Sequence, residues 1–265
     1  MNRSIALRTF AEHWKSTLAW ALTALALIAI QLSVYPSIAN SGEGIEALLE
    51  AFPDAYKEIF RMEDYTSGAG YLGTELFSLV IPFIFIAIGA TWGAGHTASE
   101  EERGTADLLF TLPITRSTVL VSKTVATVVT VVLIGALMVT ALAIGSRVVD
   151  LDVSFGGLIA ATLSSMLLGL LFCGLSLLVG VLTGKKGAAL GAATGAAVIL
   201  FLLYSLAPLV ESLNWVTPIN PFDWMLDGRP LSNGLQVAGC TKLAVTALIF
   251  HAAAMWQFSG RDVRS

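Results

Sequence analysis

Six long apolar runs, separated by shorter polar segments, dominate the chain. They cover about residues 17–35, 76–95, 124–145, 155–182, 187–209 and 237–258. A helix needs about 20 mostly apolar residues to cross the hydrocarbon core of a bilayer, and each run comes close to that length or exceeds it. Gly and Ala are abundant in the fourth and fifth runs, which predicts close helix packing there. The pattern predicts an all-α membrane protein in which residues 1–265 form one domain of six transmembrane helices.

The composition excludes several classes of protein. Hydrophobic residues make up 55% of the 265 residues and charged residues only 13%, with a mean hydropathy of +0.77. A soluble domain carries about 25% charged residues, so an ordinary soluble enzyme is excluded, and a disordered chain is excluded by the hydrophobicity. The net charge of −4 argues against nucleic acid as a partner. Two cysteines, Cys173 and Cys240, can build neither a disulfide framework nor a four-ligand zinc site.

The distribution of Lys and Arg predicts the orientation of the chain. If the N-terminus is inside, ten of these residues fall on the cytoplasmic side and five on or near the outer side. This asymmetry follows the positive-inside rule, so we expect both termini in the cytoplasm. The ten are Arg3, Arg8, Lys15, Arg103, Arg116, Lys123, Lys185, Lys186, Arg261 and Arg264, and the five are Lys57, Arg61, Arg147, Arg229 and Lys242.

The N-terminal region has two features with alternative interpretations. The first run could be a cleaved signal peptide, because Ser37-Ile38-Ala39 is a small-x-small pattern, but its apolar stretch exceeds the roughly 7–15 residues of a signal peptide. We therefore expect an uncleaved membrane anchor. The preceding segment from Ile5 to Trp14 is mildly amphipathic, which predicts a helix lying along the inner interface. The alternative is a helical extension of the first span.

Two outer segments are predicted to form short helices. In the outer loop over residues 36–74, apolar residues recur at helical spacing from Ile45 to Phe52 and again from Tyr56 to Phe60, on either side of Pro53. This acidic loop is either a lid over a substrate vestibule or a cap without ligand contacts. In residues 208–234, repeated prolines preclude one continuous helix and favour short interfacial or re-entrant pieces.

The sequence offers no catalytic residues, no metal site and no nucleotide site. His96 and Glu100 do not form a His-Glu-x-x-His motif, so a zinc protease is unsupported. A phosphate-binding Gly-x4-Gly-Lys-Ser/Thr loop around Gly184 fails, because Val179 and Lys186 occupy the positions that need Gly and Ser or Thr. The spans also contain almost no ionisable groups, which disfavours an ion-coupled carrier. If the protein drives uphill transport, we expect its energy to come from another chain.

The cytoplasmic connection between the second and third runs predicts a short helix over residues 100–112. Ser99 and Glu102 form a capping box, and the acidic residues from Glu100 onward stabilise the positive end of the helix dipole. Pro113 ends the helix. Gly104 lies in mid-helix, where glycine costs up to about 1 kcal/mol, so it favours close approach of another backbone. The helix suits docking to a cytoplasmic protein. The alternative, rest on lipid, is disfavoured by the acidic residues.

This connection resembles the coupling helix of the type 2 ABC exporter permeases, which are membrane subunits of ATP-driven transporters. An acidic group, Gly-Thr, a Leu-rich turn, Pro and a basic residue follow one another in the order found in that family, and Lys123 follows near the head of the next helix. A weaker likeness extends over the stretch from Tyr71 to Pro82 and the Arg-Asp pair at Arg261. The residues expected to bind a partner are Glu100, Glu101, Glu102, Arg103, Gly104, Thr105, Leu108, Leu109, Pro113 and Arg116.

The resemblance implies an assembly rather than a single chain. It implies two permease copies, identical or paralogous, in the plasma membrane of a prokaryote, with each coupling helix docked to a separate ABC ATPase subunit. ATP and Mg²⁺ would be bound by that ATPase, and no cofactor is expected in this chain. The substrates of the family are too diverse to carry over. The alternative function, from a different class, is a non-transporting scaffold or sensor that docks a soluble partner through the same helix.

Overall fold

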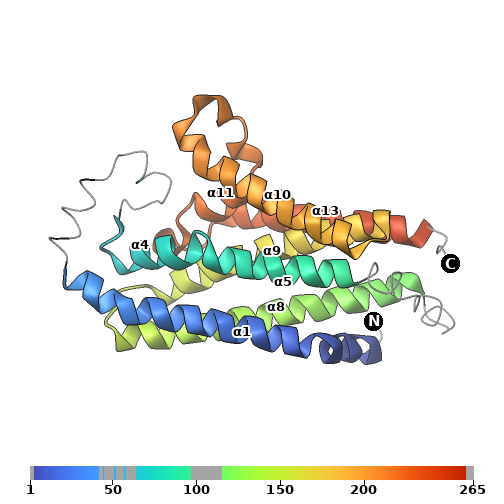
Figure 1. Ribbon diagram of the computed structural model, residues 1–265, viewed down its shortest axis with the longest axis horizontal. Coiled ribbons are helices and arrows are strands. Elements are labelled where there is room, and N and C mark those ends of the chain that lie inside the picture. The colour runs from blue at the N-terminus through green and yellow to red at the C-terminus, as the bar shows by residue number, and fades with distance from the viewer. Residues whose placement is uncertain are drawn as a thin grey trace.

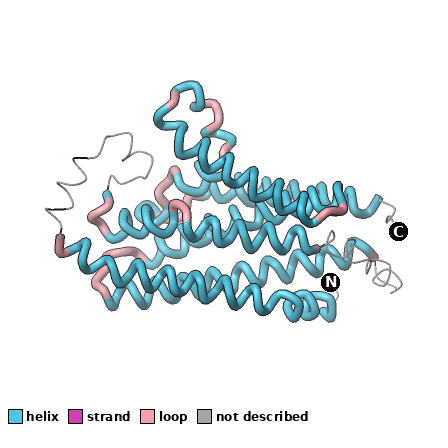
Figure 2. The backbone as a smooth tube through the Cα atoms, in the orientation of Figure 1, coloured by secondary structure: helices cyan, strands magenta, loops and turns pink. Residues whose placement is uncertain are grey.

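The computed structural model describes residues 3–41, 64–96 and 115–260, together with the single positions 44, 51 and 57. Within these residues every regular element is helical (Figures 1 and 2). Among the described residues, six helical segments are long and apolar enough to cross a membrane, which confirms the predicted all-α membrane fold. These segments are Thr9–Ala39, Gly68–Gly95, Ser117–Val148, Phe155–Thr183, Lys186–Leu209 and Val237–Ser259.

The helices extend beyond the apolar runs, because backbone hydrogen bonding continues through polar residues. The expected interfacial segment is continuous with the first span in one helix, and the predicted outer loop is shorter at both ends, since helix continues to Ala39 and resumes at Gly68. The two short helices expected within residues 45–60 fall outside the described residues, apart from positions 51 and 57. The long elements are α1 (Arg3–Ala39), α4 (Gly68–Leu72) with the π-helix η2 (Gly73–Phe77) and α5 (Val80–Gly95), α8 (Arg116–Val148), α9 (Phe155–Thr183), α10 (Lys186–Leu206) and α13 (Val237–Gly260).

Helix α9 lies at the centre of the bundle and packs against α5, α8, α10 and α13. Its contact with α5 is a close backbone crossing. A Cβ atom on Gly89 would lie 2.1 Å from the carbonyl oxygen of Gly169, and one on Gly93 would lie 2.3 Å from that of Cys173. Ser176 Oγ donates a hydrogen bond of 2.8 Å to the Ala90 carbonyl across the same contact. Glycine at these positions therefore lets the two backbones approach closely.

The ends of the central helices are set by local capping. Ser154 starts α9, because its side chain accepts a hydrogen bond from the Gly157 N–H. The helix ends at Gly184, whose φ of 67° lies in the left-handed region that glycine adopts without steric cost. The Gly184-Lys185 dipeptide is thus the turn between α9 and α10, which accounts for it without a bound phosphate.

The segment between α10 and α13 consists of short helices, as its prolines predict. Asn220 is fully buried and joins two of its neighbours. It donates from Nδ2 to the Leu200 carbonyl of α10, and its Oδ1 accepts from the Phe222 N–H at the start of α11. Figure 1 shows α10 tilting away from the other long helices toward this segment. Its elements are η3 (Ala207–Leu209), η4 (Glu211–Leu213), η5 (Thr217–Ile219), α11 (Pro221–Leu226) and α12 (Pro230–Asn233).

Candidate partner-binding site

The predicted partner-binding segment starts and ends at one end of the bundle. Helix α5 ends there at Gly95 and α8 begins there at Arg116, on the same side as both ends of the chain (Figure 1). We call this region the termini end. The residues from Glu100 to Pro113 in the predicted site lie outside the described residues, and only the backbone of Arg116 is described, as the first residue of α8. The site is therefore built from the residues that hold the two ends of this segment.

Lys123 joins the end of α5 to the beginning of α8. Its Nζ donates a hydrogen bond of 2.8 Å to the carbonyl oxygen of His96, the C-cap residue of α5. The side chain is only 6% exposed. The last carbonyls of a helix have no partner within the helix and carry partial negative charge, so an ammonium group stabilises them. The resulting hydrogen bond fixes the point at which the chain leaves α5 relative to α8.

The His96 side chain makes a second contact to the same helix. Its Nε2 lies 3.0 Å from Thr127 Oγ1, one turn along α8 from Lys123. The imidazole is buried, and this burial lowers its pKa well below the ordinary value; the positive charge of Lys123 lowers it further. His96 is therefore neutral at physiological pH. Backbone and side chain of His96 together hold two residues of α8.

Helix α1 covers this pair of ends with an aromatic contact. The His13 ring stacks on the Trp92 indole with 4.5 Å between ring centroids and 27° between planes. Phe10 meets the same indole edge-on at 6.3 Å. Trp92 is 1% exposed, and the nearest approach of His13 to the Gly95 Cβ position is 3.7 Å. The end of α5 is thus enclosed by α1 on one side and α8 on the other.

This arrangement connects the ends of α1, α5 and α8. Its polar groups hold helix ends, and the described residues contain no group of three or more His, Cys, Asp or Glu side chains able to hold a metal ion. The sequence identified Lys123 only by its position after the predicted coupling helix. Its partner His96 was missed, although both residues lie at the membrane edge of consecutive spans that must return to the same side.

A comparison with protein families identifies the kind of protein to which this connection of helix ends belongs. The family model described as "ABC-2 family transporter protein" matches residues 3–263, nearly the whole chain. The chain belongs to the ABC-2 transporter family. No curated protein matches it.

Membership in the ABC-2 family fixes the general role. The protein is a multi-pass membrane protein and the membrane subunit of an ABC transporter. An ABC-2 subunit serves transport and is not itself catalytic, and membrane subunits of this family generally work with an ABC ATPase. The family model confirms the ABC permease that the coupling motif suggested.

Proposed function

We propose that this ABC-2 subunit is the permease of an ATP-driven exporter and that it docks its ATPase through residues 100–112. The hydrogen bond from Lys123 to the His96 carbonyl carries the proposal, because it ties together the two helices from which the docking segment extends. A force applied to that segment would reach α5 and α8 together. If the ends of α5 and α8 were not joined, the same force would move only the docking segment and not the two helices.

The proposed movement continues from the docking segment into the bundle core. Helix α5 crosses α9 in backbone contact at Gly89 and Gly93, and packed helices with so little space between them move as a unit. Closure of two ATPases on ATP and Mg²⁺ would displace the docking segments, and α5 and α9 would follow. In this scheme the nucleotide and the metal belong to the ATPase, and this chain supplies only the mechanical path.

The proposed assembly has two permease copies in the plasma membrane of a prokaryote. The distribution of Lys and Arg supports a cytoplasmic position for both chain termini, and therefore for the termini end, where a cytoplasmic ATPase could reach the docking segment. The second copy is either identical or a paralogue. The alternative role, a scaffold or sensor that docks a soluble partner without transport, uses the same segment but predicts no ATP-dependent turnover.

Two substitutions in the docking segment test the proposal. Glu101→Lys reverses a charge at the expected interface, and Gly104→Leu places a bulky side chain where close backbone approach is expected. Both should abolish co-purification with the ATPase and its stimulation, since disrupting a buried interface contact typically costs about 2 kcal/mol or more, roughly thirty-fold in affinity. Yield and thermal stability of the permease should change little, because the docking segment lies outside the six membrane spans. The measurements are co-purification yield and ATPase rate in reconstituted vesicles.

Ser117→Ala is the matched control. Ser117 is an exposed residue in the first turn of α8, close to the docking segment in sequence but outside it, and its hydroxyl lies 3.2 Å from Thr115 Oγ1. This variant should bind and stimulate the ATPase as the wild type does. Full association and turnover in both Glu101→Lys and Gly104→Leu would show that residues 100–112 do not dock the ATPase. Association without ATP-dependent transport of any cargo would favour the scaffold.

A further inference from the structure

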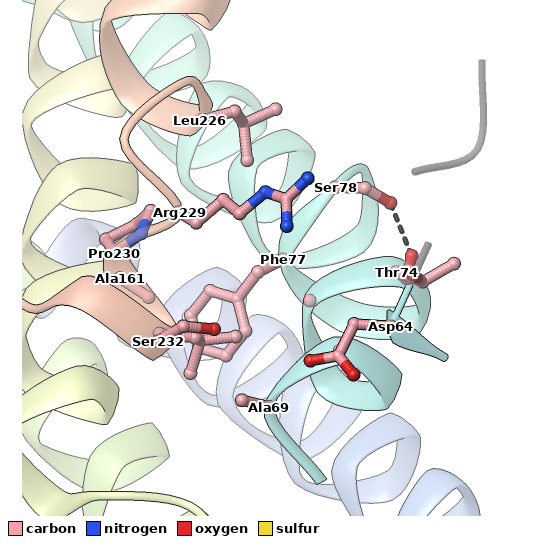
Figure 3. A pocket seen from close by; sticks show the side chains of 13 residues that line it. Asp64, Ala69, Thr74, Phe77, Ser78, Ala161, Leu226, Arg229, Pro230 and Ser232 are labelled. Atoms are coloured by element: carbon pink, nitrogen blue, oxygen red, sulfur yellow. Dashed lines mark hydrogen bonds between the residues drawn. The ribbon is translucent and has the colours of Figure 1, made fainter. Parts of the chain in front are cut away.

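A pocket lies between α4, η2 and α12 (Figure 3). Helix α4 lies at the end of the bundle opposite the termini end (Figure 1). The pocket encloses about 80 Å³. Its floor is apolar and formed by Phe77, Ala161 and Leu231, all buried. Polar residues surround this floor, among them Arg229 and Asp64 with opposite charges. The pocket is therefore amphipathic.

Local geometry fixes the backbone of Arg229 beside the pocket, and its side chain is exposed. The residue precedes α12 with φ 46° and ψ 65°, a left-handed conformation that is unusual for a residue with a side chain. Its carbonyl accepts hydrogen bonds from the N–H groups of Ser232 and Asn233, so the turn is closed on itself. Figure 3 shows the Arg229 side chain extending over Phe77 toward Ser78. The guanidinium group is thus directed across the mouth of the pocket.

Asp64 is held in place from the other side. Ser67 Oγ donates to Asp64 Oδ2 at 2.6 Å and caps the start of α4 by accepting from the Gly70 N–H. A Cβ atom on Gly70 would lie 1.7 Å from the Asp64 carbonyl oxygen, so the turn from 64 to 67 packs tightly back on α4. In Figure 3 the Asp64 side chain faces the same pocket as Arg229, from the α4 side. Only one oxygen of the carboxylate is used by Ser67.

The position of the pocket along a membrane span indicates which kind of ligand can reach it. Its lining includes Gly70, Gly73 and Thr74, which belong to the first turns of the membrane span that begins at Gly68. The end of a membrane span lies at the level of the lipid headgroups. A guanidinium group binds phosphate through paired hydrogen bonds, and a carboxylate binds an ammonium group. The apolar floor suits the part of a lipid just below its headgroup.

We propose that this pocket binds the phosphoethanolamine headgroup of a membrane phospholipid, with the phosphate on Arg229 and the amine on Asp64. A headgroup carrying both charges is complementary in charge to both side chains, whereas a purely anionic headgroup would place negative charge beside Asp64. This site is independent of the ATPase docking proposed above, because it lies at the opposite end of the bundle.

Lipid titration of the full-length purified chain tests the site. Native mass spectrometry would follow the occupancy of phosphatidylethanolamine and of phosphatidylglycerol with the same acyl chains. The wild type should prefer the ethanolamine lipid by about ten-fold. Arg229→Asn should weaken binding of both lipids by about ten-fold, and asparagine tolerates the left-handed backbone, so the turn is kept. Asp64→Asn keeps an acceptor for Ser67 and should remove only the preference for the amine.

Arg147→Asn is the control, because Arg147 is an exposed arginine in the last turn of α8, away from the lining of the pocket. It should bind both lipids as the wild type does. Soluble phosphoethanolamine at the same concentration should not displace the lipid, because the apolar floor also contacts the lipid; full displacement would contradict a membrane lipid as the occupant. Equal losses in Arg229→Asn and Arg147→Asn would overturn the proposal, as would an unchanged lipid preference in Asp64→Asn.

Discussion

At the scale of single residues, the termini end depends on two groups that are unusual at the edge of a membrane span. Lys123 is a buried cation whose ammonium group donates a hydrogen bond to the carbonyl of His96, and His96 is a buried imidazole next to that cation. Burial of a charge is costly unless a partner compensates for it. The neutral state of His96 follows from this neighbourhood, since a protonated ring would place a second positive charge beside Lys123.

This pair makes the stability of the protein sensitive to acid. The pKa of His96 is lowered in the folded state, so the unfolded chain takes up a proton near its ordinary pKa of about 6.5 while the folded chain does not. The stabilising contribution is thus complete above pH 6.5 and is lost as the pH falls toward the folded-state pKa. Between pH 7.5 and 5.5 we expect a loss on the order of 1 kcal/mol, which His96→Gln should remove.

The measurement is thermal unfolding of both purified proteins in the same detergent at several pH values. His96→Gln places an amide nitrogen near the position of the ring Nε2, so it keeps a hydrogen-bonding group beside Thr127. The difference between the two curves isolates the titration of His96. Parallel curves across this pH range would contradict a buried, neutral His96.

At the scale of helices, the sequence predicts the spans better than their contacts. Apolar run length identified all six spans, and Pro218 and Pro221 identified the broken segment before α13. Glycine spacing did not identify the contacts, because Gly89 and Gly93 of α5 have the same spacing as the glycines of α10. Those of α5 meet the α9 backbone, whereas Gly187, Gly191 and Gly195 of α10 have, within the described part of the chain, no atom beyond their own helix backbone within 4 Å of their Cβ positions. Equal spacing thus accompanies opposite packing.

In the candidate site, too, the local motif could be predicted from the sequence and the contacts between helices could not. The motif from Glu100 to Pro113 could be read from neighbouring residues, because capping and helix-stop signals are local. The contact between Lys123 and His96 joins residues 27 positions apart in different helices, and the pocket at Arg229 joins three separate segments. Hydrophobic pattern places such residues at the correct end of a span but does not select their partners.

The two sets of glycines give a matched test of the α5–α9 crossing. Gly93→Leu would force side-chain atoms against the Cys173 carbonyl, and overpacking of this kind costs about 1–3 kcal/mol or more. We expect a clear fall in the unfolding temperature and in purified yield. Gly191→Leu introduces the same side chain at an open position of α10 and should leave both nearly unchanged. An unfolding temperature for Gly93→Leu equal to that for Gly191→Leu would refute a tight crossing.

At the scale of the whole molecule, the described helices pack into one bundle whose two ends differ. The termini end ties α1, α5 and α8 together around Trp92 and His96, and α5 is bound to the central α9 by the glycine crossing. The opposite end carries the short helices and the amphipathic pocket. Such a division suits an ABC-2 subunit that receives motion at one end and meets lipid at the other.

Recovery of the native complex would show whether an ATPase docks on residues 100–112. The protein would be tagged, extracted from its native membranes, treated with a cross-linker that joins carboxylates to amines, and its co-purifying chains identified by mass spectrometry. We expect a chain with a Gly-x4-Gly-Lys-Ser/Thr loop, cross-linked through Glu100, Glu101 or Glu102. An intact complex that contains no such chain, or one whose ATPase cross-links only elsewhere, would contradict this docking.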